Sequence, residues 1–417
     1  MLQFQKNQKN ILIFFLFYIS LILGFYFNED LNYGAIGDWF HTDLPVIESL
    51  SIDFKKTLLN YEEFGHRHSP IYLIFLSMFN KIGISLELIR FFHLHISLLL
   101  IFVFYKCLTF KFDKIEKNLL ITLSLVLFLS PTFRSLSIWP SSRLIGLIFF
   151  TLSIYEFLKY QKSQKQSNII MNLLYLVISS YISPNFSLFA FYFFYEYLKT
   201  ESIKKIFFFV FFCLILSLPA FYYIFILKVN FLSAGTPGIS ESETIGLSFN
   251  FADKILIISS IIFFHLSPFL LNSSFLKDLK KIEIKNIIFI FLIFCTSLYF
   301  FNYVLNFTGG GVFFQISNFL FGNNTFFYII SLISLTVLIY FSNKKFENLL
   351  IFLILILSNI QNTIYHKYYD PLILILFFTI INTSLNLKFL REKKIYFVFI
   401  FYFIFIFMRV MKNNIII

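Results

Sequence analysis

Two carboxylates and a histidine lie within six residues in the stretch GAIGDWFHTDLP at positions 34–45, between glycines and a proline that favour turns. Asp38 and Asp43 are close enough in sequence to repel each other, and a carboxylate held near a membrane surface loses part of its hydration. Both effects strengthen a carboxylate as a proton acceptor. We expect a general base here, with Asp38 as the first candidate and Asp43 as the second. A solvated acidic loop is the alternative interpretation.

A basic segment opens the next apolar stretch. His66, Arg67 and His68 precede Ser69 and Pro70, and this Ser-Pro pair favours a helix start, because Ser can cap the helix and Pro suits its first position. The free N–H groups and positive dipole end of such a helix, beside the basic side chains, form a candidate anion site. Ordinary snorkelling of the arginine to the membrane interface is the alternative.

Two later segments place cations and hydrogen-bond donors beside apolar runs. Arg134 and Arg143 lie in a connection between two such runs, and arginines in these places usually face a cavity or a partner. Lys367 and Tyr368 lie in a polar stretch late in the chain, where Lys and Tyr also serve as ordinary interfacial anchors. All four are candidates for binding an anion.

The sequence shows no pattern of metal ligands. Cys107, Cys213 and Cys295 are far apart, and each lies in or beside an apolar run, which is typical of small packing residues. HExxH, CxxC and Walker motifs are absent, and the glycines at 309–311 have no P-loop lysine after them. His265 lies inside an apolar run, where we expect a hydrogen bond within the helix bundle. No metal site is predicted from these residues.

The composition places all these segments in a membrane protein. Apolar residues make up 58% of the 417 residues and charged residues 13%, against roughly 25% charged in soluble chains. The net charge of +12 comes from residues between apolar runs, so we expect no nucleic-acid partner. Since a crossing needs about 20 apolar residues, the sequence predicts an all-α bundle of about 13 transmembrane helices (11–13). The predicted spans are 10–27, 88–106, 118–134, 143–158, 168–183, 185–199, 206–227, 254–272, 286–306, 326–342, 348–365, 371–387 and 395–411.

The distribution of lysine and arginine predicts the orientation. Most of the 34 basic residues fall in alternate loops if the N-terminus is inside and the C-terminus is outside. The apolar stretch 70–84 is about 15 residues long, too short for a full crossing, so we expect it to be interfacial or re-entrant. The segment 28–87 then forms a long acidic first outer loop. Residues 1–417 are expected to form one transmembrane domain without a soluble C-terminal domain.

In order and spacing, these segments resemble the GT-C class of integral-membrane glycosyltransferases, which use polyprenyl-phosphate sugars and include protein mannosyltransferases and aminoarabinose transferases of lipid A. Asp38 falls where that class has an acidic residue after its first helix, and HSPIY at 68–72 resembles its Pro-Leu-Tyr segment. RFFHLH at 90–95 resembles its Arg-led second crossing, followed by the basic turn at 106–117. The resemblance covers about residues 10–160 and returns at KYYDP, 367–371.

The resemblance implies inverting transfer of a sugar from a polyprenyl-phosphate donor to a glycan, lipid or protein acceptor. The reaction is expected on the periplasmic face of a bacterial inner membrane, with membrane lipid as surroundings. An aspartate acts as base, and the donor phosphate is bound by basic and polar residues: His66, Arg67, His68, Arg134, Arg143, Lys367 and Tyr368.

Many relatives have a second acidic residue where this chain has SSR at 141–143, which argues against a divalent metal cofactor. Two other classes remain open. One is a lipid-linked-sugar flippase or small-solute transporter, and the other is an O-antigen polymerase or ligase.

Overall fold

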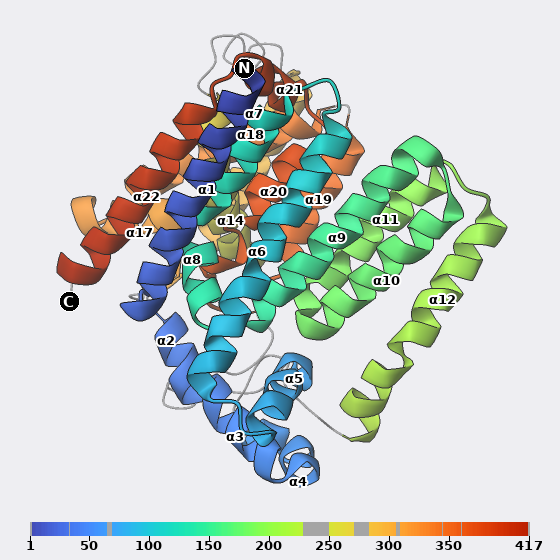
Figure 1. Cartoon of the computed structure of the whole chain (residues 1–417). Coiled ribbons are helices and arrows are strands. Elements are labelled where there is room, and N and C mark those ends of the chain that lie inside the picture. The colour runs from blue at the N-terminus through green and yellow to red at the C-terminus, as the bar shows by residue number, and fades with distance from the viewer. Residues whose placement is uncertain are drawn as a thin grey trace. The chain divides into compact units, whose positions relative to one another are not determined.

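The structure is a computed structural model of the whole chain, and it describes residues 2–32, 34–64, 69–227, 250–270, 283–305, 309–343, 345–359 and 361–415 (Figure 1). Over these ranges the chain is helical, with no strand. The helices group into two compact units. The first unit contains residues 1–246 and 399–417, and the second contains residues 247–398. A single transmembrane domain over residues 1–417 stays a prediction.

The first unit is built from long apolar helices. The closest pairing is between α9 and α10, which also lie side by side in Figure 1, and α6 packs along α9. The helices are α1 (Leu2–Tyr26), α6 (Leu86–Lys111), α9 (Ser142–Ser163), α10 (Gln166–Ile182), α11 (Phe189–Leu198) after the short turn η4 (Pro184–Leu188), α12 (Ile203–Phe221) continued by η5 (Tyr222–Ile226), and α22 (Ile395–Ile415).

Local sequence explains where several of these helices start. Ser85 accepts a hydrogen bond from the backbone N–H of Leu88 at the start of α6, and the side chain of Ser141 caps α9 in the same way. At the other end of α9, Gln164 adopts a left-handed conformation with φ 55°, which stops the helix. These caps satisfy backbone groups that the helix itself leaves without partners.

Short helices fill the segment between α1 and α6, where the sequence predicts an outer loop with interfacial or re-entrant helices. They lie together at one end of the first unit, away from the start of α1 (Figure 1). At about 1.5 Å per residue the twelve residues of α5 span about 18 Å, less than a bilayer core. The elements are α2 (Ala35–Gly37), η1 (Asp38–Asp43), α3 (Leu44–Ile52), α4 (Phe54–Leu59), η2 (Tyr61–Phe64) and α5 (Pro70–Lys81).

The predicted span 118–134 is broken. α7 (Lys117–Leu125) and η3 (Val126–Leu129) end at Ser130, and α8 (Pro131–Ile138) then leaves at an angle of 67°. Pro131 occupies the first turn of α8, and Ser130 accepts a hydrogen bond from the N–H of Phe133, so this pair starts a new helix. The whole of α8 is buried.

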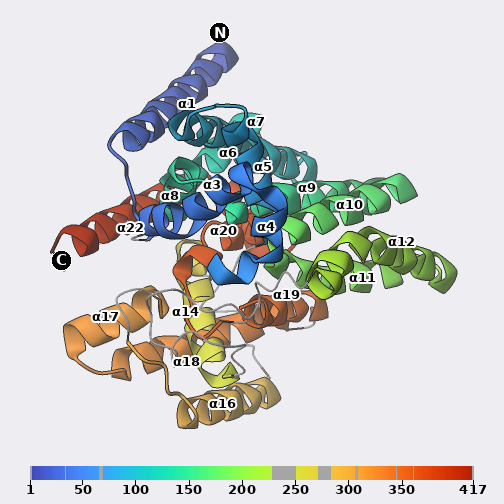
Figure 2. The same cartoon turned by 90° about the horizontal axis from the view of Figure 1, so that it is seen from below.

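The second unit surrounds α14, which packs against α16, α17 and α18 (Figure 2). A Cβ added at Gly311, at the start of α17, would lie 2.7 Å from Ile261 on α14, so only glycine allows this close approach. Phe269 of α14 stacks on Phe377 with ring centroids 4.5 Å apart. The helices are α14 (Phe251–Leu270), α16 (Ile284–Tyr299), α17 (Gly311–Phe321), α18 (Thr325–Ser342), α19 (Phe346–Leu357), η6 (His366–Tyr368), α20 (Leu372–Thr379) and α21 (Ser384–Arg391).

The apolar helices support an integral membrane protein. In the described ranges, seven helices are long and apolar enough to cross a bilayer, and the number rises to nine if each of two bent pairs is one span. The second bent pair is 366–379 with 384–391, at 88°. The helices at 284–299, 311–321 and 346–357 are apolar but shorter. The count of 13 spans and the N-in, C-out orientation stay predictions.

Candidate functional site

The two predicted bases lie on one π-helical turn, η1, which directly follows α2. The backbone N–H of Leu44 bonds the carbonyl of Trp39, five residues back, and the hydroxyl of Thr42 bonds the carbonyl of Asp38. Asp38 is half-buried, whereas Asp43 is only 8% exposed. Single π-helical turns are rare and often occur at functional sites. The structure therefore gives the two carboxylates different surroundings on the same short element.

Asp43 lies near two buried tyrosines from other elements of the first unit. Tyr61 of η2 is fully buried, and Tyr72 of α5 is 4% exposed. Burial, and then the charge of Asp43, raise the pKa of both tyrosine hydroxyls well above the ordinary value of 10.0. Both tyrosines therefore stay protonated near neutral pH. Tyr72 ends the HSPIY segment that stands out in the sequence, but neither it nor Tyr61 was predicted to lie near Asp43, because only the folded loop brings positions 43, 61 and 72 together.

Tyr72 also connects the acidic turn to the long helices. Its hydroxyl lies 2.5 Å from Nδ1 of His93 on α6, and Nε2 of His93 lies 2.7 Å from the carbonyl oxygen of Leu136 on α8. His93 is 1% exposed. Ser69, the cap of α5, bonds Tyr223 near the end of α12, so a second link joins this loop to the bundle. The loop that holds the carboxylates is thus fixed by buried polar contacts on two sides.

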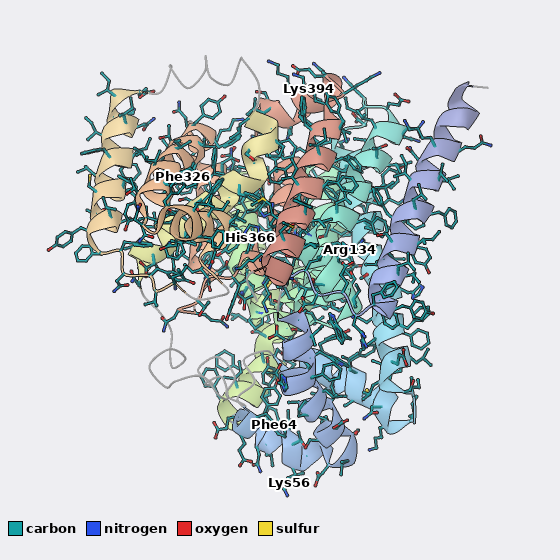
Figure 3. All side chains as sticks on the ribbon, turned by 90° about the vertical axis from the view of Figure 1, so that its left-hand side faces the viewer. Lys56, Phe64, Arg134, Phe326, His366 and Lys394 are labelled. Atoms are coloured by element: carbon teal, nitrogen blue, oxygen red, sulfur yellow. The ribbon has the colours of Figure 1, made fainter. Side chains whose placement is uncertain are left out.

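Arg134 binds an acid of the same unit. Its Nε and Nη2 donate to the two carboxylate oxygens of Glu29 at 2.6 and 2.7 Å, and Nη1 and Nη2 also bond the hydroxyl and carbonyl oxygens of Ser20. Arg134 lies within the bundle, whereas Phe64 marks the short helices at its end (Figure 3). Glu29 was not predicted to be this partner, although a buried arginine requires one.

A second arginine near this pair is held by aromatic rings. The guanidinium carbon of Arg90 lies 3.7 Å from the ring centroid of Trp139 and 5.0 Å from that of Phe25. Its Nη2 donates to the side-chain oxygen of Asn28. Trp139 in turn donates from its indole nitrogen to the carbonyl of Glu29. Trp139 is 2% exposed and connects the two arginines through Glu29.

The other predicted anion ligands have separate positions. Arg143 is half-buried at the start of α9, with its guanidinium carbon 5.6 Å from the ring centroid of Phe186. His66, Arg67 and His68 lie outside the described residues. Ser69 does cap α5, as predicted, by accepting a hydrogen bond from Ile71.

Lys367 and Tyr368 belong to the second unit. The Nζ of Lys367 lies 5.2 Å from the ring centroid of Tyr365. The hydroxyl of Tyr368 donates a hydrogen bond to the side-chain oxygen of Gln361. Next to them, Nε2 of His366 lies 2.8 Å from Nε2 of His265, which confirms the hydrogen bond predicted for His265. The predicted site residues are therefore distributed over both units.

Metal ligands do not cluster in the part of the chain that the structure describes: no three His, Cys, Asp or Glu side chains there are placed to hold one ion.

Compared with protein-family models, with curated proteins and with solved structures, the chain matches none.

Proposed function

We propose that the protein is an integral-membrane glycosyltransferase. It moves a sugar from a polyprenyl-phosphate donor to an acceptor hydroxyl on the outer face of a bacterial inner membrane. One observation carries the proposal: a single π-helical turn holds Asp38 and Asp43, one half-buried and one buried beside tyrosines, on short helices at one end of an apolar bundle. A carboxylate at such an end can meet a donor whose lipid chain stays among the helices.

In the proposed step, the acceptor oxygen attacks the anomeric carbon while Asp38 takes the proton from that oxygen. A new carbon–oxygen bond forms, and the bond between the anomeric carbon and the phosphate oxygen breaks. The electron pair leaves on polyprenyl phosphate, and a single displacement inverts the anomeric centre. Asp38 is the first choice because it is half-buried and so more accessible than Asp43, which is the alternative base.

The departing phosphate needs positive charge close to its oxygens. Arg143 suits this role because it lies half-buried at the first turn of α9, where the helix N–H groups add to its charge. Arg134 is a weaker candidate than the sequence suggested, because Glu29 and Ser20 already accept its hydrogen bonds. Lys367 and Tyr368 stay candidates in the second unit, and His66, Arg67 and His68 stay candidates from the sequence.

The test is transfer of a labelled sugar from polyprenyl phosphate by purified protein in liposomes. Asp38→Asn and Asp43→Asn remove one proton acceptor each with little change of shape, and loss of the base lowers the rate by about 10²–10⁴-fold. Glu62→Gln, an exposed acid on the neighbouring η2, is the matched control and keeps the wild-type rate. Wild-type rates in both aspartate variants would overturn the proposed base.

A carrier for lipid-linked sugars or small solutes is the second candidate, and one observation favours it. His265 and His366 are 1% and 5% exposed in the second unit, and Asp370 is 2% exposed nearby in sequence. Ionisable groups buried in a membrane protein often belong to a transport path. Translocation of a fluorescent lipid-linked sugar across liposomes, without any sugar transfer, would favour the carrier; transfer that needs Asp38 or Asp43 favours the enzyme.

A further inference from the structure

α12 has a weak point near its end. Pro219 lies inside the helix and has no N–H, so the carbonyl of Ile215 lacks the donor that an ordinary helix supplies. Next to it, the hydroxyl of Tyr181 on α10 donates to the carbonyl oxygen of Leu216 at 2.7 Å and accepts from the N–H of Ala220 at 3.1 Å. These are two groups that an α-helix joins directly. A side chain that bridges them marks a position where the helix can bend.

The segment after this position, residues 219–226, has little packing to hold it. Across α12 and η5, which the structure describes throughout, the buried residues are Ile206 and Phe209, both in the first turns of α12. Phe221 and Ile226 are each more than half exposed. Because lipid tails are as apolar as these side chains, moving the segment through the bilayer changes little apolar contact. Its position therefore depends on its few polar contacts.

Tyr223 supplies such a contact on η5. Its ring centroid lies 6.5 Å from that of Tyr181, and its hydroxyl is hydrogen-bonded to Ser69, the cap of α5. α5 packs on α3, which directly continues η1, the turn that holds the two candidate bases. Figure 1 likewise shows the end of α12 directed toward α4 and α5. The bendable segment is thus joined to the helices that carry the candidate site.

We propose that residues 219–226 form a hinged flap, which pivots where Tyr181 bridges α12 and closes against Ser69. When the bond between Tyr223 and Ser69 breaks, the flap swings into the lipid and opens a lateral path beside α5. The apolar chain of a lipid-linked substrate enters by this path. The role of the flap rests on the proposed function, whose donor has a polyprenyl chain.

The movement is measured without any sugar donor, as the distance between two spin labels on the protein in lipid nanodiscs. One label is attached to the flap at Ile226→Cys and the other to α5 at Met78→Cys, two exposed positions, in a protein with Cys213→Ala and Cys295→Ala. Cys107 is fully buried and is kept. The labelled protein is expected to show a short and a longer distance, for the closed and the open flap.

Two variants test the closing contact and the hinge separately. Tyr223→Phe removes the hydroxyl that bonds Ser69, so the ratio of open to closed flap is expected to rise about fivefold. Pro219→Ala restores the missing N–H and its helical bond, so one narrow distance distribution is expected. Tyr222→Phe, an exposed tyrosine on the same turn, is the matched control and leaves the distances unchanged. An unchanged distribution in Tyr223→Phe or in Pro219→Ala, or an equal shift in Tyr222→Phe, would overturn the proposal.

Hydrogen exchange tests the pivot itself. Tyr181→Phe takes away the acceptor of the Ala220 N–H, so exchange of this amide is expected to become about fivefold faster. Tyr175→Phe, another half-buried tyrosine of α10, is the control and keeps the wild-type rate. Unchanged or slower exchange in Tyr181→Phe would show that α12 closes its own bond at this position, and the pivot would be wrong.

Sugar transfer separates this inference from the proposed function. If the flap admits the lipid chain, Pro219→Ala is expected to slow transfer several-fold from a long-chain polyprenyl-phosphate donor and to leave transfer from a short-chain isoprenoid donor unchanged. Equal slowing with both donors would overturn the lateral path. A protein that shows both label distances but transfers sugar from neither donor would overturn the proposed function and leave the hinged flap standing.

Discussion

The guanidinium of Arg134 and the carboxylate of Glu29 form a bidentate ion pair, with Nε–Oε1 and Nη2–Oε2 distances of 2.6 and 2.7 Å. The two residues are 105 positions apart in the sequence. The Arg134 side chain is 6% exposed and the Glu29 side chain 23%. The pair joins α8 to the residues that follow α1. It therefore holds the broken span in place against the first helix.

Removing one partner of this pair is expected to destabilise the first unit strongly. Glu29→Gln leaves a buried guanidinium without its opposite charge, at a cost of about 3–5 kcal/mol in the free energy of unfolding. Thermal unfolding in detergent, followed by circular dichroism, measures it. Asp113→Asn is the control, because its partner Lys162 and Asp113 itself are both exposed, and the melting temperature should hardly change. Equal melting temperatures for both variants would contradict the prediction.

The close contact of α9 with the end of α10 depends on Gly146. A Cβ at this position would lie 2.7 Å from the Cβ of Ser183, so Gly146→Ala forces the helices apart. We expect a loss of about 1–3 kcal/mol in unfolding free energy. Gly37→Ala is the matched control: Gly37 has helical φ −62° and open space around it, so alanine there should stabilise by about 0.4–1 kcal/mol. Stabilisation by both changes would show that α9 and α10 are not tightly packed here.

His265 and His366 are expected to be coupled: the effects of replacing them on the free energy of unfolding should not add. Replacing one histidine by leucine takes away the partner that the other has at 2.8 Å in a buried place, which costs about 1–3 kcal/mol. A double-mutant cycle with His265→Leu and His366→Leu measures the coupling by unfolding. Ser267→Ala, which removes only a bond back to the carbonyl of Phe264, is the control. Additive effects of the two leucines would mean that the pair has no coupling energy.

The carboxyl group of Glu201 is expected to make a pH-dependent contribution to the free energy of unfolding. Burial raises the pKa of its carboxyl group, but hydrogen bonds from Lys205 and Tyr160 and the charge of Lys205 outweigh burial and lower it below the ordinary value of 4.5. The folded state therefore binds this proton less tightly than the unfolded state. The stabilisation is present above pH 4.5 and is lost as the pH falls through the lower folded value.

Glu201→Gln tests this sign. At neutral pH the variant is expected to melt below the wild type, and the difference should shrink as the pH is lowered beneath 4.5. Tyr160→Phe, which removes one of the hydrogen bonds at 2.9 Å, should lose part of the same pH dependence. A difference that grows in acid would contradict the assignment of Lys205 and Tyr160 as stabilising partners of the carboxylate.

The long helices could be predicted from the sequence because apolar runs of about 20 residues have one simple explanation. The spans predicted at 10–27, 88–106 and 254–272 fall on α1, α6 and α14. The bend at Ser130 was missed, although Ser-Pro was correctly interpreted as a helix start at Ser69. Hydropathy reports how long an apolar run is. The hydropathy profile gives no signal at a bend within such a run.

The site was predictable only in part, because its contacts join distant positions. The acidic turn stood out by its spacing, but Tyr61 and Tyr72 become its neighbours only when the loop folds. Arg134 was identified as a residue in need of a partner, and Glu29 was one of several acids in the loop. One sequence contains no information that favours one of these acids over another. Only the tertiary packing determines that Glu29 is the partner of Arg134.

The last helix belongs to the unit that the first helix begins. Phe399 stacks on Phe17 with ring centroids 6.1 Å apart, and Asn413 donates a hydrogen bond to the carbonyl of Asp30, 383 positions earlier. During synthesis on the ribosome, α1 enters the bilayer long before α22 exists. Its apolar side must therefore stay against lipid, or against an insertion chaperone, until translation reaches position 399. Assembly of the first unit is thus completed only after the second unit has been made.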